Sequence, residues 1–314
     1  MLEVKGVKTY YLTDEGQVKA VDGVSFAMER GETLGLAGES GCGKTTLALT
    51  ITRLLPRNAR VISGEIYFDG VEILSLDEEE FRKIRWKDIS IIFQEAMNAL
   101  NPVRRVGDQI VEAILLHENV AREEAVDRVM NALEMVGIDR ERFWHYPHEF
   151  SGGMRQRALI AMALVCNPKL VIADEPVTAL DVMVRAQVLK LIKELQSKMD
   201  LSMILITHDL SVIAETCDRV AIMYAGKIVE IGDVISIFKD PKHPYTKGLV
   251  KAFPSIYGPR ELPASISGTP PDLLNPPSGC RFHPRCPHVM DICKVEEPEM
   301  KRINGKQYVA CHLY

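Results

Sequence analysis

A glycine-rich segment that ends in a lysine and two threonines is the part of the sequence best suited to chemistry. It reads Gly38-Glu39-Ser40-Gly41-Cys42-Gly43-Lys44-Thr45-Thr46 and fits the spacing G-x-x-x-x-G-K-[ST]. Glycines let the backbone curl so that successive N–H groups face one anion. Lys44 can reach the β- and γ-phosphates of a nucleotide, and the Thr45 hydroxyl can ligate Mg²⁺. The segment therefore predicts a site for a nucleoside triphosphate.

Two adjacent carboxylates offer the second chemical group. Asp174 and Glu175 directly follow the apolar run Leu170-Val171-Ile172-Ala173, which is typical of a buried strand. The first carboxylate suits Mg²⁺, directly or through water, and the second suits orienting or deprotonating an attacking water molecule. A strand that merely ends in solvated acids is the alternative, and it is less favoured beside a phosphate-binding loop at the same sheet edge.

These groups need a sheet and its helices to position them. The apolar run 32–37 before the glycine-rich segment predicts a buried strand, and residues 47–55 after it predict a helix that stops at Pro56. Residues 1–75 otherwise read as strands, with an Asp-Gly hairpin turn at residues 69–70 and a second hairpin turn at Ala225-Gly226. Residues 76–160 have helical spacing, and strands and helices alternate again from residue 169. We therefore expect an α/β fold with a mainly parallel, covered sheet, an antiparallel β subdomain and a helical insertion.

Composition limits the function classes. The chain has 314 residues, of which 46% are hydrophobic and 26% charged, with a net charge of −5. That balance gives no general attraction to nucleic acid or acidic lipid. No apolar run approaches the roughly 20 residues that a membrane span needs. The N-terminus enters a strand pattern directly, which argues against a signal peptide and favours a cytoplasmic protein.

Ser151-Gly152-Gly153 stands where a helix begins, with Ser151 as a natural N-cap for the apolar run that follows. Taken alone the segment is more typical of an ordinary capped helix, and the alternative is a second anion site made by the exposed N–H groups of the helix start. Phe150-Ser151-Gly152-Gly153-Met154 resembles the Leu-Ser-Gly-Gly-Gln signature of ATP-binding cassette (ABC) proteins, with departures only at its two ends. With the segments already described, Ile91-Ile92-Phe93-Gln94 resembles the Q-loop of that family, Thr178-Ala179-Leu180-Asp181 its D-loop, and Thr207-His208-Asp209 its H-loop. The resemblance spans residues 1 to about 235 and implies a P-loop NTPase cassette.

The resemblance also implies roles for individual residues. ATP would be bound by the phosphate loop and would contact Gln94 and His208, while Mg²⁺ would be held through Thr45, Gln94 and Asp174. Glu175, His208 and Gln94 would form the catalytic set. Tyr11 would stack on adenine, with Tyr10 as its rival, because strand alternation lets only one of them face the nucleotide. The loop residues implied in ATP binding are Ser40, Gly41, Cys42, Gly43, Lys44, Thr45 and Thr46.

Cassettes of this family pair head to tail, so Ser151, Gly152 and Gly153 would act on the partner's ATP, and Asp181 would belong to the D-loop. The resemblance implies an ATPase that drives transport through membrane permease subunits. We expect a heterodimer with a related ATPase subunit, and a homodimer remains possible. The extracytoplasmic peptide-binding protein would be an indirect partner, and we expect no nucleic acid partner. The chain would sit at the cytoplasmic face of the cell membrane as a peripheral subunit.

The C-terminal extension carries a separate signal. Nine of the 17 prolines lie between Pro254 and Pro287, and after about residue 235 we expect irregular structure. His243-Pro244-Tyr245 resembles a motif of the oligopeptide and dipeptide subgroup of ABC importers. Cysteines follow at 280, 286, 293 and 311, with the spacing C-x5-C-x6-C-x17-C. A reducing cytoplasm opposes disulfides, and the long spacings favour a [4Fe-4S] cluster over Zn²⁺, although zinc stays open. The tail's resemblance to dipeptide and oligopeptide ATPase subunits also implies a cluster held by Cys280, Cys286, Cys293 and Cys311.

Taken together, the residues and the resemblance predict two regions and one function. Residues 1–235 would form the nucleotide-binding domain, with a helical subdomain at about 95–160, and residues 236–314 would form the extension. The chain would hydrolyse ATP to power uptake of dipeptides or oligopeptides. A nickel importer of the same family is the nearer alternative. A cassette ATPase that acts on DNA is the more distant one, because the chain has neither heptad coiled coils nor a basic surface.

Overall fold

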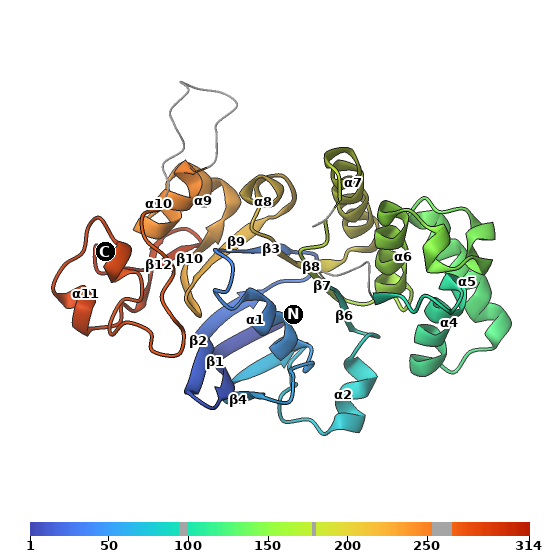
Figure 1. The fold of residues 1–314 in the computed structure, drawn as a ribbon, viewed down its shortest axis with the longest axis horizontal. Helices are drawn as coiled ribbons and strands as arrows, with labels where there is room; N and C mark the ends of the chain where they lie inside the picture. Colours follow the sequence, from blue (N-terminus) through green and yellow to red (C-terminus); the bar gives the residue numbers. More distant parts are fainter. Residues whose placement is uncertain (94–98, 178–179, 253–265) are drawn as a thin grey trace. The chain divides into compact units, whose positions relative to one another are not determined.

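Two compact units make up the chain in the computed structural model, which describes residues 1–93, 99–177, 180–252 and 266–314. Unit 1 combines Met1–Leu74 with Leu205–Tyr314, and unit 2 is Ser75–Ile204. The two ends of the sequence, blue and orange to red in Figure 1, therefore belong to one unit. In the part of the chain that the structure describes, no helix is long and apolar enough to cross a membrane.

An antiparallel sheet forms the N-terminal part of unit 1. Its strand order is β2-β1-β4-β5. The predicted Asp-Gly turn joins β4 to β5, with Asp69 and Gly70 at φ of 48° and 83°. Two successive left-handed residues match the twist of antiparallel strands, so this predicted hairpin is confirmed. The strands are β1 (Leu2–Thr13), β2 (Gly16–Met28), β4 (Ala59–Phe68) and β5 (Val71–Glu72).

The core of unit 1 lies around a second set of strands. β3 (Thr33–Ala37) is buried along its whole length and pairs in parallel with β9 (Arg219–Tyr224). β9 turns back through Ala225 and Gly226, at φ of 47° and 83°, into the antiparallel β10 (Lys227–Asp233). This hairpin too is as predicted.

The C-terminal segment adds two strands and several helices to unit 1, so the expectation of irregular structure after about residue 235 is wrong there. β12 (Gln307–Ala310) pairs with β10, and β11 (Met300–Asn304) pairs with β12. The prolines that prompted the expectation end at residue 287, ahead of both strands. The helices of unit 1 are α1 (Lys44–Ile51), α8 (Leu210–Thr216), α9 (Val234–Lys239), α10 (Pro244–Lys251), α11 (Ile292–Val295) and the 3₁₀ turn η3 (His283–Arg285).

Unit 2 is mainly helical. Its strands β6 (Ile89–Ile92) and β7 (Leu170–Asp174) are buried and parallel, and β8 (Ser202–Ile206) contains the boundary between the units. The helices α4, α5 and α6, green in Figure 1, contact one another and account for the predicted helical insertion. The helices are α2 (Glu78–Ile84), α4 (Val106–His117), α5 (Arg122–Met135), η1 (Arg140–Trp144), η2 (Pro147–Glu149), α6 (Gly152–Leu164) and α7 (Val182–Met199).

His243 is a buried histidine that fixes the start of α10. Its side chain is 1% exposed, and its Nδ1 accepts a hydrogen bond of 3.1 Å from the backbone N–H of Tyr245. The Glu230 carboxylate accepts from the backbone N–H groups of Lys242 and His243 at 2.8 Å each, and from the Gln307 amide at 2.9 Å. Glu230 therefore joins the start of α10 to the C-terminal strand β12.

Burial lowers the pKa of His243 to about 3, with a smaller effect from Lys247. An unfolded histidine titrates near 6.5. The stability that comes from keeping His243 neutral is therefore complete above about pH 6.5 and is lost as pH falls toward the folded pKa. We expect the free energy of unfolding to fall by up to about 1.4 kcal/mol for each pH unit in this window.

The variant His243→Asn keeps a capping oxygen but does not titrate. Urea unfolding of the full chain between pH 7 and pH 4.5 should show a shallower loss of stability for this variant than for the wild-type chain. The exposed residue His148, replaced in the same way, provides the control and should leave the slope unchanged. An equally steep loss in His243→Asn would contradict this assignment.

Candidate functional site

The phosphate loop lies where the sequence predicts it, between β3 and α1 of unit 1. Gly43 is the N-cap of α1 at φ of 106°, and no side chain caps that helix end. The first N–H groups of α1 are therefore available to an anion. A Cβ atom at Gly43 would lie 1.9 Å from the Ala20 carbonyl oxygen, and one at Gly38 would lie 2.1 Å from the Met223 carbonyl oxygen. Only glycine fits at these two positions.

Lys44 is held inside the loop. Its Nζ donates to the carbonyl oxygens of Gly38 and Glu39, at 2.8 and 3.0 Å, and the residue is 7% exposed. Thr45 beside it is exposed, so its hydroxyl is accessible for the predicted role as a Mg²⁺ ligand. Burial raises the pKa of the Cys42 thiol, and the Lys44 charge opposes that rise. Cys42 is thus a neutral packing group in the loop.

The two candidate tyrosines have different surroundings. Tyr10 is 7% exposed, and its hydroxyl donates to the Asp22 carboxylate at 2.6 Å. The Tyr11 hydroxyl lies 3.2 Å from the Thr46 hydroxyl, at the first turn of α1. Tyr11 is therefore the tyrosine on the side of the phosphate loop, as the sequence resemblance favours.

The segment after β8 also belongs to unit 1. The backbone N–H of Thr207 donates to the carbonyl oxygen of Leu36 on β3 at 3.4 Å, so this segment runs beside the strand that leads into the phosphate loop. The Thr207 hydroxyl accepts from the N–H of Asp209 at 3.0 Å, and Asp209 caps α8. His208 stands exposed between them.

The carboxylate pair lies in unit 2 at the end of β7. Asp174 is the last residue of the strand and is 3% exposed. Glu175 follows at φ of 46°, a left-handed backbone conformation that is uncommon outside glycine and asparagine. Backbone strain of this kind gathers at functional sites. Because of this conformation the chain turns at Glu175 and does not continue along the line of β7. Glu175 itself is partly exposed.

The Ser-Gly-Gly segment and Asp181 lie together in unit 2. Ser151 caps α6 by accepting from the N–H of Met154 at 3.3 Å, and Asp181 caps α7 by accepting from the N–H of Val184 at 2.9 Å. A Cβ atom at Gly153 would lie 2.5 Å from a Val184 methyl group. The glycine thus lets the starts of α6 and α7 pack closely. Gln94, Thr178 and Ala179 lie outside the described residues.

Comparison with known proteins agrees with this arrangement. Residues 21–178 match the ABC transporter family, and residues 229–293 match the C-terminal region of oligopeptide/dipeptide transporters. The oligopeptide transport ATP-binding protein OppD of Bacillus subtilis is 49% identical over 318 residues, which cover 100% of this chain and 88% of that protein. The dipeptide transport ATP-binding protein DppD of the same organism is also 49% identical, over 100% and 94% of the two chains.

This chain belongs to the ABC transporter family. Its match to the oligopeptide/dipeptide C-terminal region places it in the corresponding subgroup. The ATP-binding cassette MJ0796, solved as a dimer in a post-hydrolysis state bound to ADP and Pi, superposes with a TM-score of 0.67 at 28% identity. That alignment covers 74% of this chain and 99% of MJ0796. The predicted family, cassette fold and ATPase class are thereby confirmed.

The four C-terminal cysteines of this ABC protein are free thiols, and the backbone N–H of Cys280 donates to the Cys293 carbonyl oxygen at 2.9 Å. Burial raises the pKa of Cys280 to about 11, and the charges of Cys293, Cys311 and Cys286 add to the rise. Among the described residues, however, no three histidine, cysteine, aspartate or glutamate side chains are arranged to hold a metal ion. The side-chain arrangement thus gives no support to the predicted [4Fe-4S] or zinc site, which stays a prediction.

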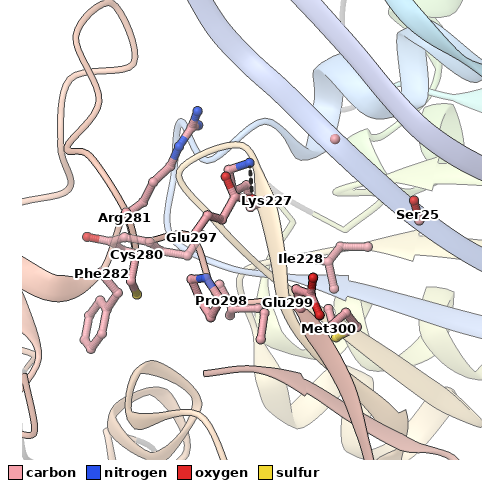
Figure 2. A pocket seen from close by; sticks show the side chains of 15 residues that line it. Ser25, Lys227, Ile228, Cys280, Arg281, Phe282, Glu297, Pro298, Glu299 and Met300 are labelled. Atoms are coloured by element: carbon pink, nitrogen blue, oxygen red, sulfur yellow. Dashed lines mark hydrogen bonds and ion pairs between the residues drawn. The ribbon is translucent and has the colours of Figure 1, made fainter. Parts of the chain in front are cut away.

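A cavity of about 450 Å³ lies beside this C-terminal segment, within unit 1. Figure 2 shows Lys227 and Glu297 facing each other at its wall, where their side chains form an ion pair of 2.6 Å. Arg281 and Phe282, which also line it, leave the chain in opposite directions. The C-terminal segment of the ABC protein is thereby anchored to β10.

Sequence reasoning missed the residues that join the C-terminal segment to the phosphate loop. They are Glu39 in the loop itself, Tyr245 of α10 and Arg285 between two of the cysteines. The signal that the sequence offered was the carboxylate of Glu39 in the phosphate-binding loop. A carboxylate beside an anion site is expected to pair with a cationic side chain. The partner could not be chosen from the 38 lysines and arginines of the chain.

Proposed function

We propose that this chain is the ATP-hydrolysing subunit of an importer for oligopeptides or dipeptides. The observation that carries the proposal is the C-terminal region, which matches that of oligopeptide/dipeptide transporters over residues 229–293. Relatives named for oligopeptide and dipeptide transport align along the whole chain, which favours peptides over the nickel and DNA alternatives.

The proposed mechanism assigns each described group a task. Lys44 and the N–H groups of the loop bind the triphosphate, and Tyr11 stacks on adenine. Glu175 accepts the proton of the attacking water molecule, and His208 contacts the γ-phosphate. Ser151 and Gly153 of a second cassette close over the same phosphate. ATP thus joins two subunits, and its hydrolysis lets them part.

Mg²⁺ would be held by oxygen donors that both units supply. Thr45 supplies an exposed hydroxyl at the start of α1, and Asp174 supplies a carboxylate at the end of β7. Oxygen donors of this kind suit Mg²⁺, and Gln94 would complete the set. The ion would neutralise charge on the β- and γ-phosphates.

A hollow on unit 2 supports docking to a permease. It measures about 580 Å³, and its lining combines apolar residues, among them Val103 at 79% and Leu116 at 56% exposure, with five charged residues, Arg104, Arg105, Asp108, Glu112 and Arg122. Exposed apolar side chains rimmed by polar residues are typical of interaction sites. Two of these charged residues, Arg122 and Asp108, form an ion pair of 2.7 Å. We propose that a cytoplasmic loop of the permease occupies the hollow, which would hold the subunit at the cytoplasmic face of the membrane.

The finer partner assignments are part of the same proposal. The second cassette would be a related but different ATPase subunit, and an extracytoplasmic peptide-binding protein would deliver the substrate to the permease. Residues 1–235 would act as the nucleotide-binding domain, and residues 236–314 as an extension specific to this subgroup. Purification of the chain with its permease and analysis of the ATPase stoichiometry would test the heterodimer.

A transport assay tests the function directly. The complex with its permease and binding protein, placed in lipid vesicles, should hydrolyse ATP faster when di- or oligopeptides are added. Ni²⁺ in place of peptide should give no stimulation. Stimulation by Ni²⁺ alone, or by neither substrate in a complex that binds ATP, would overturn the peptide assignment.

We also propose that Cys280, Cys286, Cys293 and Cys311 bind a [4Fe-4S] cluster. Support comes from the backbone hydrogen bond that joins Cys280 to Cys293 and from the burial of Cys293 and Cys311. Thiolates are the usual ligands of such clusters. The cluster would tie together segments that are far apart in the sequence.

Iron and sulfide analysis of anaerobically purified protein tests this proposal. The expected result is about four iron and four sulfide per chain with a brown colour, and a Cys293→Ser variant should lose most of both. One zinc per chain and no colour would replace the cluster by zinc. Absence of metal from the wild-type chain would overturn both.

A further inference from the structure

Glu39, the second residue of the phosphate loop, is held by the C-terminal region from two sides. Its carboxylate accepts two hydrogen bonds from the Arg285 guanidinium, at 2.7 and 3.0 Å. Its backbone N–H donates to the Tyr245 hydroxyl at 2.9 Å. The bidentate arrangement is the strongest form of an arginine–carboxylate pair. The loop is therefore bound to residues that lie more than 200 positions later in the sequence.

The Gly38–Glu39 peptide links these contacts to Lys44. The N–H of this peptide donates to Tyr245, and its carbonyl oxygen accepts from Lys44 Nζ at 2.8 Å. A rotation of the peptide plane would break both hydrogen bonds at once. Tyr245 therefore fixes the carbonyl oxygen that positions the lysine expected to bind phosphate.

Both C-terminal residues are rigidly placed. Tyr245 is fully buried, and its ring packs against Tyr224 and Phe282, with ring centroids 4.6 and 5.4 Å apart. The Arg285 side chain is 5% exposed, and it also donates to the carbonyl oxygen of Ser267 at 2.9 Å and to the Tyr224 hydroxyl at 3.3 Å. The guanidinium is thus held independently of Glu39 and presents a fixed charge to it.

A second arginine of the same segment supports the loop from its other end. Arg281 is 7% exposed and donates to the Ala225 carbonyl oxygen and to the Asp22 carboxylate. Ala225 belongs to the β9–β10 turn, and Gly226 of that turn donates its N–H to the Cys42 carbonyl oxygen at 2.9 Å. The segment 281–285 therefore contacts the start of the phosphate loop directly and its end through this turn.

We propose that Arg285 and Tyr245 are positioning residues for nucleotide binding, through which the C-terminal region sets the affinity of the phosphate loop for ATP. The proposal rests on the ATP-binding function proposed above. Arg285 neutralises a carboxylate that would otherwise repel the triphosphate, and Tyr245 holds the peptide that orients Lys44. Their loss should therefore affect ATP binding itself in addition to stability.

Equilibrium binding of a fluorescent ATP analogue with Mg²⁺ to the full chain tests the proposal. Arg285→Ala leaves the Glu39 carboxylate unpaired beside the phosphates, and we expect the Kd to rise about tenfold. In the Glu39→Gln background the same replacement should change the Kd less than about twofold, because no charge is left to neutralise. Arg285→Lys, which keeps the charge but not the fork, should fall between wild type and Arg285→Ala.

Two further variants separate positioning from simple loss of structure. Arg219→Ala breaks another partly buried ion pair of unit 1, with Glu32 at 2.9 Å, and should lower the melting temperature without changing the Kd. Tyr245→Phe removes only the hydroxyl and keeps the ring, so it should weaken binding several-fold while lowering stability only by the loss of one hydrogen bond.

Three results would overturn the proposal. In the first, Arg285→Ala and Tyr245→Phe both bind the analogue as tightly as the wild type. In the second, Arg285→Ala weakens binding equally in the Glu39 and Glu39→Gln backgrounds, which would point to general damage. In the third, the wild-type chain does not bind the analogue, which would overturn the proposed function as well. Wild-type binding that is lost in Lys44→Ala establishes the function separately from the role of Arg285.

Discussion

Replacement of Glu175 by glutamine should lower ATP turnover by a factor of about 10² to 10⁴, the range that a general base contributes. Glutamine has the shape of glutamate but cannot accept the proton of the attacking water molecule. ATP binding should remain, because Lys44 and the loop N–H groups are the residues proposed to hold the triphosphate. A pair of cassettes that binds ATP but does not cleave it should stay closed, so the variant should accumulate as a dimer in ATP.

Turnover and dimerisation can be measured on one preparation. Phosphate release gives the rate, and size-exclusion chromatography with Mg²⁺ and ATP gives the dimer fraction, both in the presence of the second cassette proposed above. Glu123→Gln makes the same chemical change at an exposed position in the first turn of α5 and should leave both quantities unchanged. Normal turnover by Glu175→Gln would remove Glu175 from the catalytic assignment.

Replacement of Gly43 by alanine should abolish nucleotide binding. A Cβ atom at this position would lie 1.9 Å from the Ala20 carbonyl oxygen, and real Cβ atoms do not approach backbone that closely. Either the loop or β2 has to move, and the φ of 106° adds strain for any residue with a side chain. The displaced loop would no longer direct its N–H groups at one anion. We expect the affinity for the ATP analogue to fall by at least about 100-fold.

Gly70→Ala separates strain from collision. Gly70 has a φ of 83°, but a Cβ atom there meets nothing within 4 Å. This replacement should cost only the left-handed strain of about 1 kcal/mol and leave the affinity unchanged. If Gly43→Ala bound the analogue as well as Gly70→Ala does, the structural account of the loop would be wrong.

Local sequence patterns were sufficient to predict the strand, loop and helices of the site, because each of these elements is specified by residues adjacent in the sequence. The run 33–37, the glycines at 38 and 43 and Lys44 define strand, loop and helix with no help from distant residues. The same holds for Ser151 and Asp181, which cap the helices that directly follow them. Both hairpin turns with positive φ were also marked by their own residues.

Distant pairings were not predictable in this way. Glu39 meets Arg285 across 246 positions, and Arg281 meets Asp22 across 259. No periodicity or spacing selects one arginine over another for such a contact. β11 and β12 are short strands whose pairing with β10 depends on the fold around them. The metal that the four cysteines would bind could not be predicted for the same reason. Their spacing indicates which residues could be ligands, but it does not fix how the side chains are arranged.

The C-terminal strands have a consequence for how the chain behaves when shortened. β10 carries Ile228, Val229 and Ile231, and on the side away from β9 it is covered by β12. The edge strand on this side of the sheet is instead β11, which is mostly exposed and carries Lys301 and Arg302. Charged outer strands discourage pairing between molecules, whereas apolar ones promote it. A chain cut at residue 235 would lack β11 and β12, so the apolar strand β10 would become the edge of the sheet in place of the charged β11. Such a fragment is expected to self-associate and precipitate.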